Sequence, residues 1–104
     1  MGFVYETLDK FHAKTPISVV IEGGAEGADR CARLWANANV IVTFEYPADW
    51  KAYGKKAGYL RNIRMRDEGK PDVVIAFPGG KGTQMMVDLA KEKNIPVLTI
   101  EYKV

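Results

Sequence analysis

Residues 73–86 read VVIAFPGGKGTQMM, an apolar run that passes through Pro78 and several glycines into a helical pattern. The apolar residues over Asp72–Phe77 predict a strand that is buried on both faces, as the strands of parallel sheets are. The helix is expected near Thr83–Lys93, with Thr83 as its N-cap. A strand that enters a helix through glycines indicates an α/β fold.

The same order of strand, turn and helix occurs upstream. Ile17–Ile21 is followed by a glycine-rich turn and by a helix near Ala28–Ala38. The face of that helix expected to be buried consists of Ala28, Cys31, Ala32 and Trp35. The other expected elements are a helix over Phe3–His12, a strand over Val40–Tyr46, a polar loop over Pro47–Lys56, a helix over Ala57–Glu68 and a strand over Pro96–Tyr102. We therefore predict one small three-layer α/β domain over residues 1–104, with a mainly parallel sheet of about four strands.

The composition excludes several kinds of site. A net charge of +2 is too small to indicate nucleic-acid binding by itself. Cys31 is the only cysteine and His12 the only histidine, so we expect no internal disulfide, no metal and no cofactor. His12 is expected at the surface, and Cys31 and Trp35 in the core. No apolar run approaches about 20 residues and no signal-peptide pattern is present, so the protein is expected to be cytoplasmic.

The turn after residue 77 has the composition of a phosphate-binding loop. It consists of Pro78, Gly79, Gly80, Lys81, Gly82 and Thr83. Glycines let backbone N–H groups approach a ligand, and the N-terminus of the following helix favours an anion, to which Lys81 adds a charge. The Gly-Lys-Ser/Thr order of a Walker loop is absent. A tight strand-to-helix turn without a ligand is the alternative.

A second glycine-rich turn follows the strand at Ile17–Ile21. Its candidate ligand-binding residues are Gly23, Gly24, Ala25, Gly27 and Asp29. Both turns follow strands of the predicted parallel sheet, so we expect both at the carboxyl edge, where the ligands of such sheets bind. Asp29 either complements the dipole of its own helix or binds hydroxyl groups of a ligand.

The segment between the two turns supplies further candidates. These are Asp49, Trp50, Gly58, Arg61 and Asn62. Trp50 can stack on a base, and Arg61 can bind a phosphate or a ribose. A packed loop with surface arginines is the alternative. Lys51–Arg66 holds six basic residues and no acidic ones, which suits either an anionic ligand or a solvated face.

Four motifs occur in order over about residues 3–102. They are Gly-Gly-Ala-x-Gly-Ala-Asp, Ala-Asp-Trp with a following Gly-Lys, Ala-Gly-x-x-Arg-Asn-x-x-Met, and Pro-Asp-x-x-x-Ala-Phe-Pro-Gly-Gly-x-Gly-Thr. Together they resemble the YspA/cpYpsA-related branch of the SLOG superfamily. The resemblance implies a Rossmann-like fold that binds nucleotides or nucleotide-derived ligands. The superfamily includes cytokinin-activating phosphoribohydrolases (the "lysine decarboxylase-like" proteins), a DNA-processing protein and sensors of nucleotide signals.

The sequence departs from these phosphoribohydrolases at position 86. Their motif Pro-Gly-Gly-x-Gly-Thr-x-x-Glu places a glutamate where this chain has Met86, whereas their arginine corresponds to Arg61. Cleavage of the N-glycosidic bond develops positive charge on the ribose, which a carboxylate stabilises and a thioether does not. Met86 therefore favours binding over hydrolysis.

A second departure lies at the N-terminus. Relatives have a strand and a loop before the helix that corresponds to Phe3–His12, and that strand is central in the usual order. We expect either that its two neighbours pair directly, giving four parallel strands, or that another chain closes the gap. The second arrangement predicts a homo-oligomer.

The leading interpretation is a binding module that senses or sequesters a nucleotide-like small molecule. The first alternative is a phosphoribohydrolase acting on nucleoside 5′-monophosphates, with Arg61 and Asp29 as catalytic candidates. Asp49 is a further carboxylate, and Asp88 is expected to point away from the ligand. The second alternative is single-stranded nucleic-acid binding by the segment Lys51–Arg66, with Tyr53 and Tyr59 as stacking platforms.

Overall fold

The computed structural model describes residues 2–79 and 81–101. Gly80 of the predicted phosphate loop and the side chain of Lys81 lie outside the described part. The chain divides into two compact units, residues 1–47 and residues 48–104, and each is described by itself. The single domain over residues 1–104 stays a prediction.

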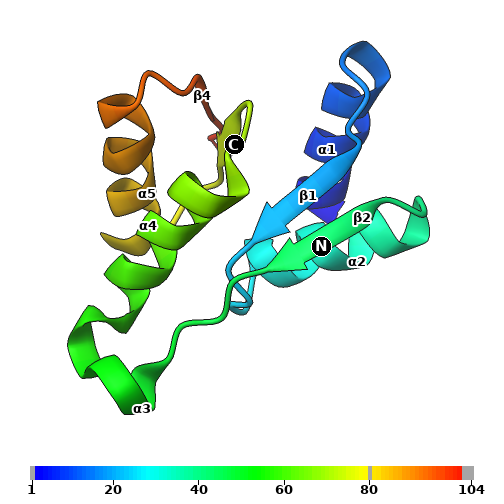
Figure 1. The fold of residues 1–104 in the computed structure, drawn as a ribbon. Helices are drawn as coiled ribbons and strands as arrows, with labels where there is room; N and C mark the ends of the chain where they lie inside the picture. The colour runs from blue at the N-terminus through cyan, green and yellow to red at the C-terminus, as the bar shows by residue number, and fades with distance from the viewer. Residues whose placement is uncertain (1, 80, 102–104) are drawn as a thin grey trace. The chain divides into compact units, whose positions relative to one another are not determined.

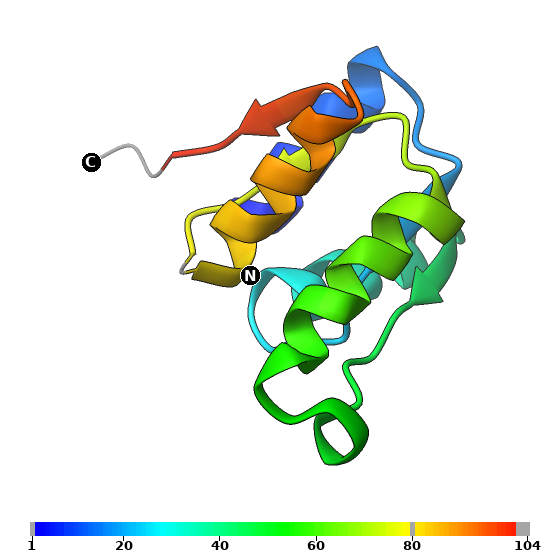
Figure 2. The same ribbon diagram turned by 60° about the vertical axis from the view of Figure 1, so that its left-hand side comes forward.

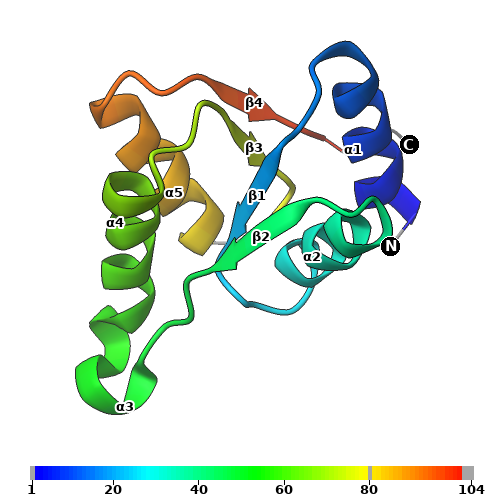
Figure 3. The same cartoon turned by 45° about the vertical axis from the view of Figure 1, so that its right-hand side comes forward.

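Unit 1, residues 1–47, contains two helices and two parallel strands. These are α1 (Gly2–Lys14), β1 (Val19–Glu22), α2 (Ala28–Ala38) and β2 (Val42–Glu45). The strands lie side by side with Val19 opposite Val42 and Glu22 opposite Glu45 (Figures 1 and 3). Helix α2 packs on both strands and on α1. Strand and helix order therefore follows the predicted β-α-β pattern.

The core of unit 1 is built around Trp35 of α2, which is 1% exposed. Its indole Nε1 donates a hydrogen bond of 2.8 Å to Asp9 Oδ1 on α1. His12 lies on α1 as predicted, but it is half-buried and not fully at the surface. The ring packs edge-on to Trp35 with 5.4 Å between ring centres, and Nδ1 accepts a 2.8 Å hydrogen bond from the Ile17 N–H. An imidazole has an apolar body with polar nitrogens, so it can close the edge of a core while pairing a backbone amide.

Unit 2, residues 48–104, contains the second strand pair. Its elements are α3 (Trp50–Tyr53), the 3₁₀ turn η1 (Gly54–Lys56), α4 (Ala57–Gly69), β3 (Val74–Ala76), α5 (Lys81–Glu92) and β4 (Val97–Thr99). Strands β3 and β4 are parallel, with Val74 opposite Val97. Figure 2 shows β4 running beside α5. Helix α4 packs against α5, and the Arg66 guanidinium joins them through the Leu89 carbonyl at 3.2 Å and Glu92 at 2.9 Å.

Four parallel strands alternating with helices confirm the predicted α/β, Rossmann-like arrangement. Within the described residues the ladders are β1–β2 and β3–β4, so the strands form two small sheets where the sequence predicted one. One of the two predicted arrangements was direct pairing that joins all four strands into one sheet. A ladder linking β1 or β2 to β3 or β4 is not found within the described residues.

Two local predictions are wrong. The polar loop Pro47–Lys56 contains α3, because Asp49 Oδ1 accepts a 3.0 Å hydrogen bond from the Ala52 N–H and so caps a helical turn. Helix α5 begins at Lys81, so Thr83 lies inside its first turn and is not the N-cap.

Candidate functional site

The glycine-rich turn of unit 1 joins β1 to α2 and needs two of its glycines. Gly24 has φ +76° and Gly27 has φ +84°, both in the left-handed region that side chains disfavour. A Cβ at Gly24 would also lie 3.1 Å from Cδ of Glu45. The turn therefore requires glycine at position 24 for its conformation, and a side chain there would also press on Glu45.

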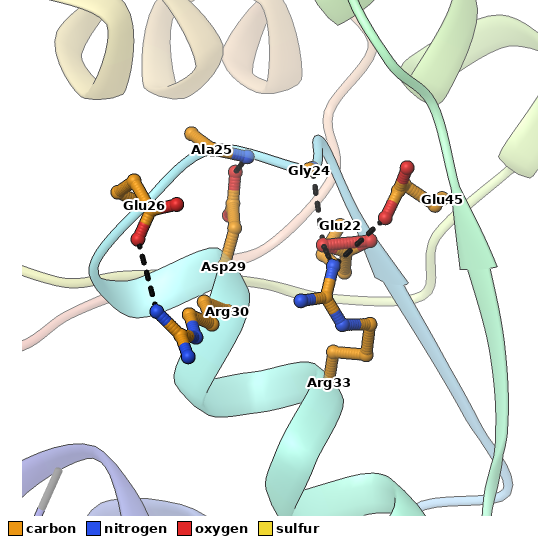
Figure 4. Close-up of polar contacts among 8 residues, drawn as sticks. All are labelled: Glu22, Gly24, Ala25, Glu26, Asp29, Arg30, Arg33 and Glu45. Atoms are coloured by element: carbon orange, nitrogen blue, oxygen red, sulfur yellow. Dashed lines mark hydrogen bonds and ion pairs between the residues drawn. The ribbon is translucent and has the colours of Figure 1, made fainter.

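Two amides of this turn have carboxylate partners from the same unit (Figure 4). The Gly24 N–H donates to Glu22 Oε1 at 3.0 Å, and the Ala25 N–H donates to Asp29 Oδ2 at 3.3 Å. These contacts are the kind that a phosphate oxygen makes with a glycine-rich loop. An anion reaching either amide would have to displace a carboxylate.

Glu22 is the residue of this turn that the sequence analysis missed. It is 3% exposed although it ends β1 beside Glu45 of β2. Its Oε1 lies 4.0 Å from Arg33 Nη1, which pairs more closely with Glu45 at 2.9 Å, and its Oε2 has no hydrogen-bond partner among the described residues. The available signal was a single acidic residue that ends an apolar strand directly before Gly-Gly.

Burial raises the pKa of Glu22 above its ordinary value of 4.5. The Gly24 N–H and the Arg33 guanidinium act in the opposite direction, whereas the neighbouring Glu45 and Asp29 carboxylates raise the pKa further. A buried carboxyl with a raised pKa at the carboxyl end of a parallel strand is a candidate functional group.

In unit 2, Asn62 ties the first turn of α5 to α4. This side chain is 4% exposed, and its Nδ2 donates to the Gly82 carbonyl at 3.4 Å and lies 3.8 Å from Met85 Sδ. Its Oδ1 accepts a 2.9 Å hydrogen bond from Arg61 Nε. Asn62 therefore holds the Arg61 guanidinium near the N-terminus of α5.

Trp50 lies on the same side of α4. A Cβ at Gly58 would lie 3.5 Å from Trp50 Cη2 and 4.0 Å from Arg61 Nη2, so the indole edge and the guanidinium flank this glycine. The Trp50 side chain remains largely exposed, at 61%. The arrangement leaves an aromatic face beside a cation.

The turn before α5 is closely packed where Gly79 approaches Thr83. A Cβ at Gly79 would lie 2.5 Å from Thr83 Oγ1, which explains the glycine there. A hollow of about 430 Å³ opens from this turn along α5 toward the carboxyl end of β4. Residues that line it include Pro78, Gly79, Thr83, Lys91, Thr99 and Glu101.

Comparison with known proteins decides the family. The model of the YspA, cpYpsA-related SLOG family matches residues 1–53. The chain belongs to this family. It is also similar to the Gene 61 protein of Mycobacterium phage D29, being 43% identical over 97 residues that cover 86% of this chain and 77% of that protein. No solved structure shows significant similarity.

Membership of the SLOG family suggests a nucleotide-related ligand. The matched segment contains the glycine-rich turn of unit 1 and ends at Tyr53, the last residue of α3, so the turn Pro78–Thr83 lies outside it. The predicted site residues fall into two groups. Unit 1 holds Gly23, Gly24, Ala25, Gly27 and Asp29, and unit 2 holds Asp49, Trp50, Gly58, Arg61, Asn62 and the described part of the turn from Pro78 to Thr83. Their part in ligand binding stays a prediction.

The carboxylates proposed for hydrolysis have local partners. Asp29 accepts from the Ala25 N–H, Asp49 caps α3, and Asp88 accepts a 2.9 Å hydrogen bond from Gln84 Nε2. Across residues 2–79 and 81–101, no group of three His, Cys, Asp or Glu residues is arranged to hold a metal ion. In the same described part, no helix is both long and apolar enough to cross a membrane.

Proposed function

We propose that this SLOG-family protein binds a nucleotide or nucleotide-derived small molecule and acts as a sensing or sequestering module. Arg61 contacts the phosphate or ribose, Trp50 stacks on the base, and the N-terminus of α5 accepts the anionic group. The observation that carries the proposal is the chain of contacts from Arg61 through Asn62 to the Gly82 carbonyl, which holds a guanidinium beside a helix N-terminus.

Several features of unit 2 support an anionic, aromatic ligand. The exposed face of Trp50 beside Gly58 provides a stacking surface. Arg61 is pre-oriented by its bond to Asn62, and a guanidinium binds phosphate oxygens in pairs. The tight contact of Gly79 with Thr83 keeps side chains away from the turn, so a ligand can approach the backbone there.

We further propose that the ligand is not cleaved. The position of the hydrolase glutamate is Met86, within α5, and a thioether cannot stabilise the charge that develops on ribose. The ligand would therefore be released uncleaved, as expected of a protein that senses or sequesters it.

Isothermal titration calorimetry with AMP, ADP, cyclic AMP and ADP-ribose tests the proposal, using Arg61→Gln and the matched control Arg64→Gln. Arg64 lies one turn further along α4, is exposed and pairs with Glu68 at 2.9 Å. We expect Arg61→Gln to weaken binding about 10- to 100-fold, as loss of a charged hydrogen bond does, and Arg64→Gln to change it by less than about twofold. Absence of binding to all four compounds, or equal losses in both variants, would contradict the proposal.

A further inference from the structure

We propose that Glu22 binds a pair of adjacent hydrogen-bond donors on the ligand, so that the glycine-rich turn of unit 1 recognises hydroxyl or amino groups and not phosphate. The inference rests on the proposed function, because it takes from it the nucleotide-like chemistry of the ligand. Vicinal hydroxyls of a pentose and the N–H edge of a guanine both present such a donor pair.

The charges around the turn disfavour an anion. Three carboxylates, Glu22, Asp29 and Glu45, gather near the Gly24 amide with one guanidinium, that of Arg33 (Figure 4). The neighbouring Glu26 pairs separately with Arg30 at 3.4 Å. With the carboxyls ionised, the cluster keeps an excess of negative charge, and its amides at Gly24 and Ala25 already have acceptors. Groups that donate hydrogen bonds fit this site better than groups that accept them.

The decisive atom is Glu22 Oε2. The side chain is 2% exposed, Oε1 accepts from the Gly24 N–H, and Oε2 has no partner among the described residues. Buried polar atoms nearly always have hydrogen-bond partners, so an acceptor without one needs an explanation. A ligand donor at Oε2, with a second donor on the remaining lone pair of Oε1, would satisfy the carboxylate.

A partly exposed ion pair stands beside this carboxylate. The side chains of Arg33 and Glu45 are 35% and 42% exposed, and their contact of 2.9 Å lies next to Glu22. Exposed ion pairs contribute little and rearrange readily. Rotation of Arg33 away from Glu22 would open a route to the carboxylate on the side that faces Glu45, while Gly24 presents no side chain to block it.

NMR titrations with two pairs of nucleotides test the inference, with the Gly24 and Ala25 amides as local probes. AMP is compared with 2′-deoxy-AMP, which lacks one hydroxyl of the diol. GMP is compared with IMP, which lacks the amino group of guanine. We expect the native protein to prefer the complete donor pair by about tenfold or more in one comparison, and this comparison identifies which group Glu22 binds.

Glu22→Gln should reduce that preference to less than about twofold, because the amide that replaces Oε2 donates and no longer accepts. Glu22→Asp, which withdraws the carboxylate by one methylene, should do the same and serves if the glutamine variant does not fold. Glu26→Gln, in the same turn but exposed, should keep the preference. Binding of the nucleotides without discrimination in either pair, or discrimination that survives both Glu22 variants, would overturn the inference alone. No binding by any of the four would overturn the proposed function with it.

Discussion

Replacing Glu22 with glutamine is expected to stabilise the protein at neutral pH and to leave its stability almost unchanged in acid. Burial raises the pKa of this carboxyl in the folded state above its ordinary value of 4.5. The folded protein therefore binds the proton more tightly than the unfolded chain does. The favourable contribution is complete below pH 4.5 and is lost as the pH rises through the raised pKa. Glutamine carries no charge in either state and removes this dependence.

The structure sets the size of the effect. Glu22 is almost fully buried, Oε2 has no hydrogen-bond partner within the described part of the chain, and Arg33 comes no nearer than 4.0 Å. An unsatisfied buried group costs about 1–3 kcal/mol and more when it is charged, so exchanging the carboxylate for a neutral amide removes the extra cost of the charge while the Gly24 hydrogen bond to Oε1 is kept. We therefore expect Glu22→Gln to raise the free energy of unfolding by about 1–2 kcal/mol at pH 7.

Urea unfolding followed by circular dichroism between pH 4 and pH 8 measures the difference. The difference in the free energy of unfolding between Glu22→Gln and the native protein should be near zero at pH 4 and should grow as the pH rises. Glu26→Gln should have the free energy of unfolding of the native protein at every pH. A Glu22→Gln variant that is less stable at pH 7, or a gap that does not depend on pH, would refute the assignment of Glu22 as a buried, poorly compensated carboxylate.

Three further predictions concern the two units and their assembly. Asp9→Ala leaves the buried Trp35 N–H without its acceptor and should lower the free energy of unfolding by about 1–3 kcal/mol, whereas Asp9→Asn keeps a carbonyl acceptor and should lose less in the same urea experiment. Arg66→Ala should lower the melting temperature more than Arg64→Ala does, because Arg66 bonds to Leu89 and Glu92 of α5 whereas Arg64 pairs with Glu68 of its own helix, and equal shifts would contradict this role. Light scattering at micromolar concentration should give the mass of a dimer or larger homo-oligomer, since Val19, Val42 and Phe44 of the β1–β2 sheet are exposed, and a monomer mass would contradict the prediction.

The sequence predicted those features that depend on local pattern. Helix α2 matches its predicted range because its apolar residues repeat with the helical period and glycines precede it. The four strands were found as apolar runs, although each is shorter than expected. The pairing of these strands into two sheets is a contact between distant segments, which periodicity does not encode.

The sequence likewise predicted only part of the candidate site. Glycine-rich turns, Trp50 and Arg61 stand out in the sequence because their residue types suit ligands. Glu22 does not, because its burial and its unpaired oxygen arise from β2 and α2, which the fold brings beside it. The capping of α3 by Asp49 was missed for a different reason, because it depends on a single local hydrogen bond to the Ala52 N–H in a segment of polar, loop-like composition.

Proton and phosphorus NMR of AMP and GMP, followed over hours with the protein in the same tube, distinguishes binding of the nucleotide from its cleavage. We expect the phosphate and ribose resonances of at least one nucleotide to shift or broaden in proportion to the bound fraction, and the H1′ signal to keep its full integral. Release of free base with ribose 5-phosphate would show a hydrolase and contradict the claim that the ligand stays uncut. Spectra of both nucleotides that are unchanged by the protein would contradict binding itself.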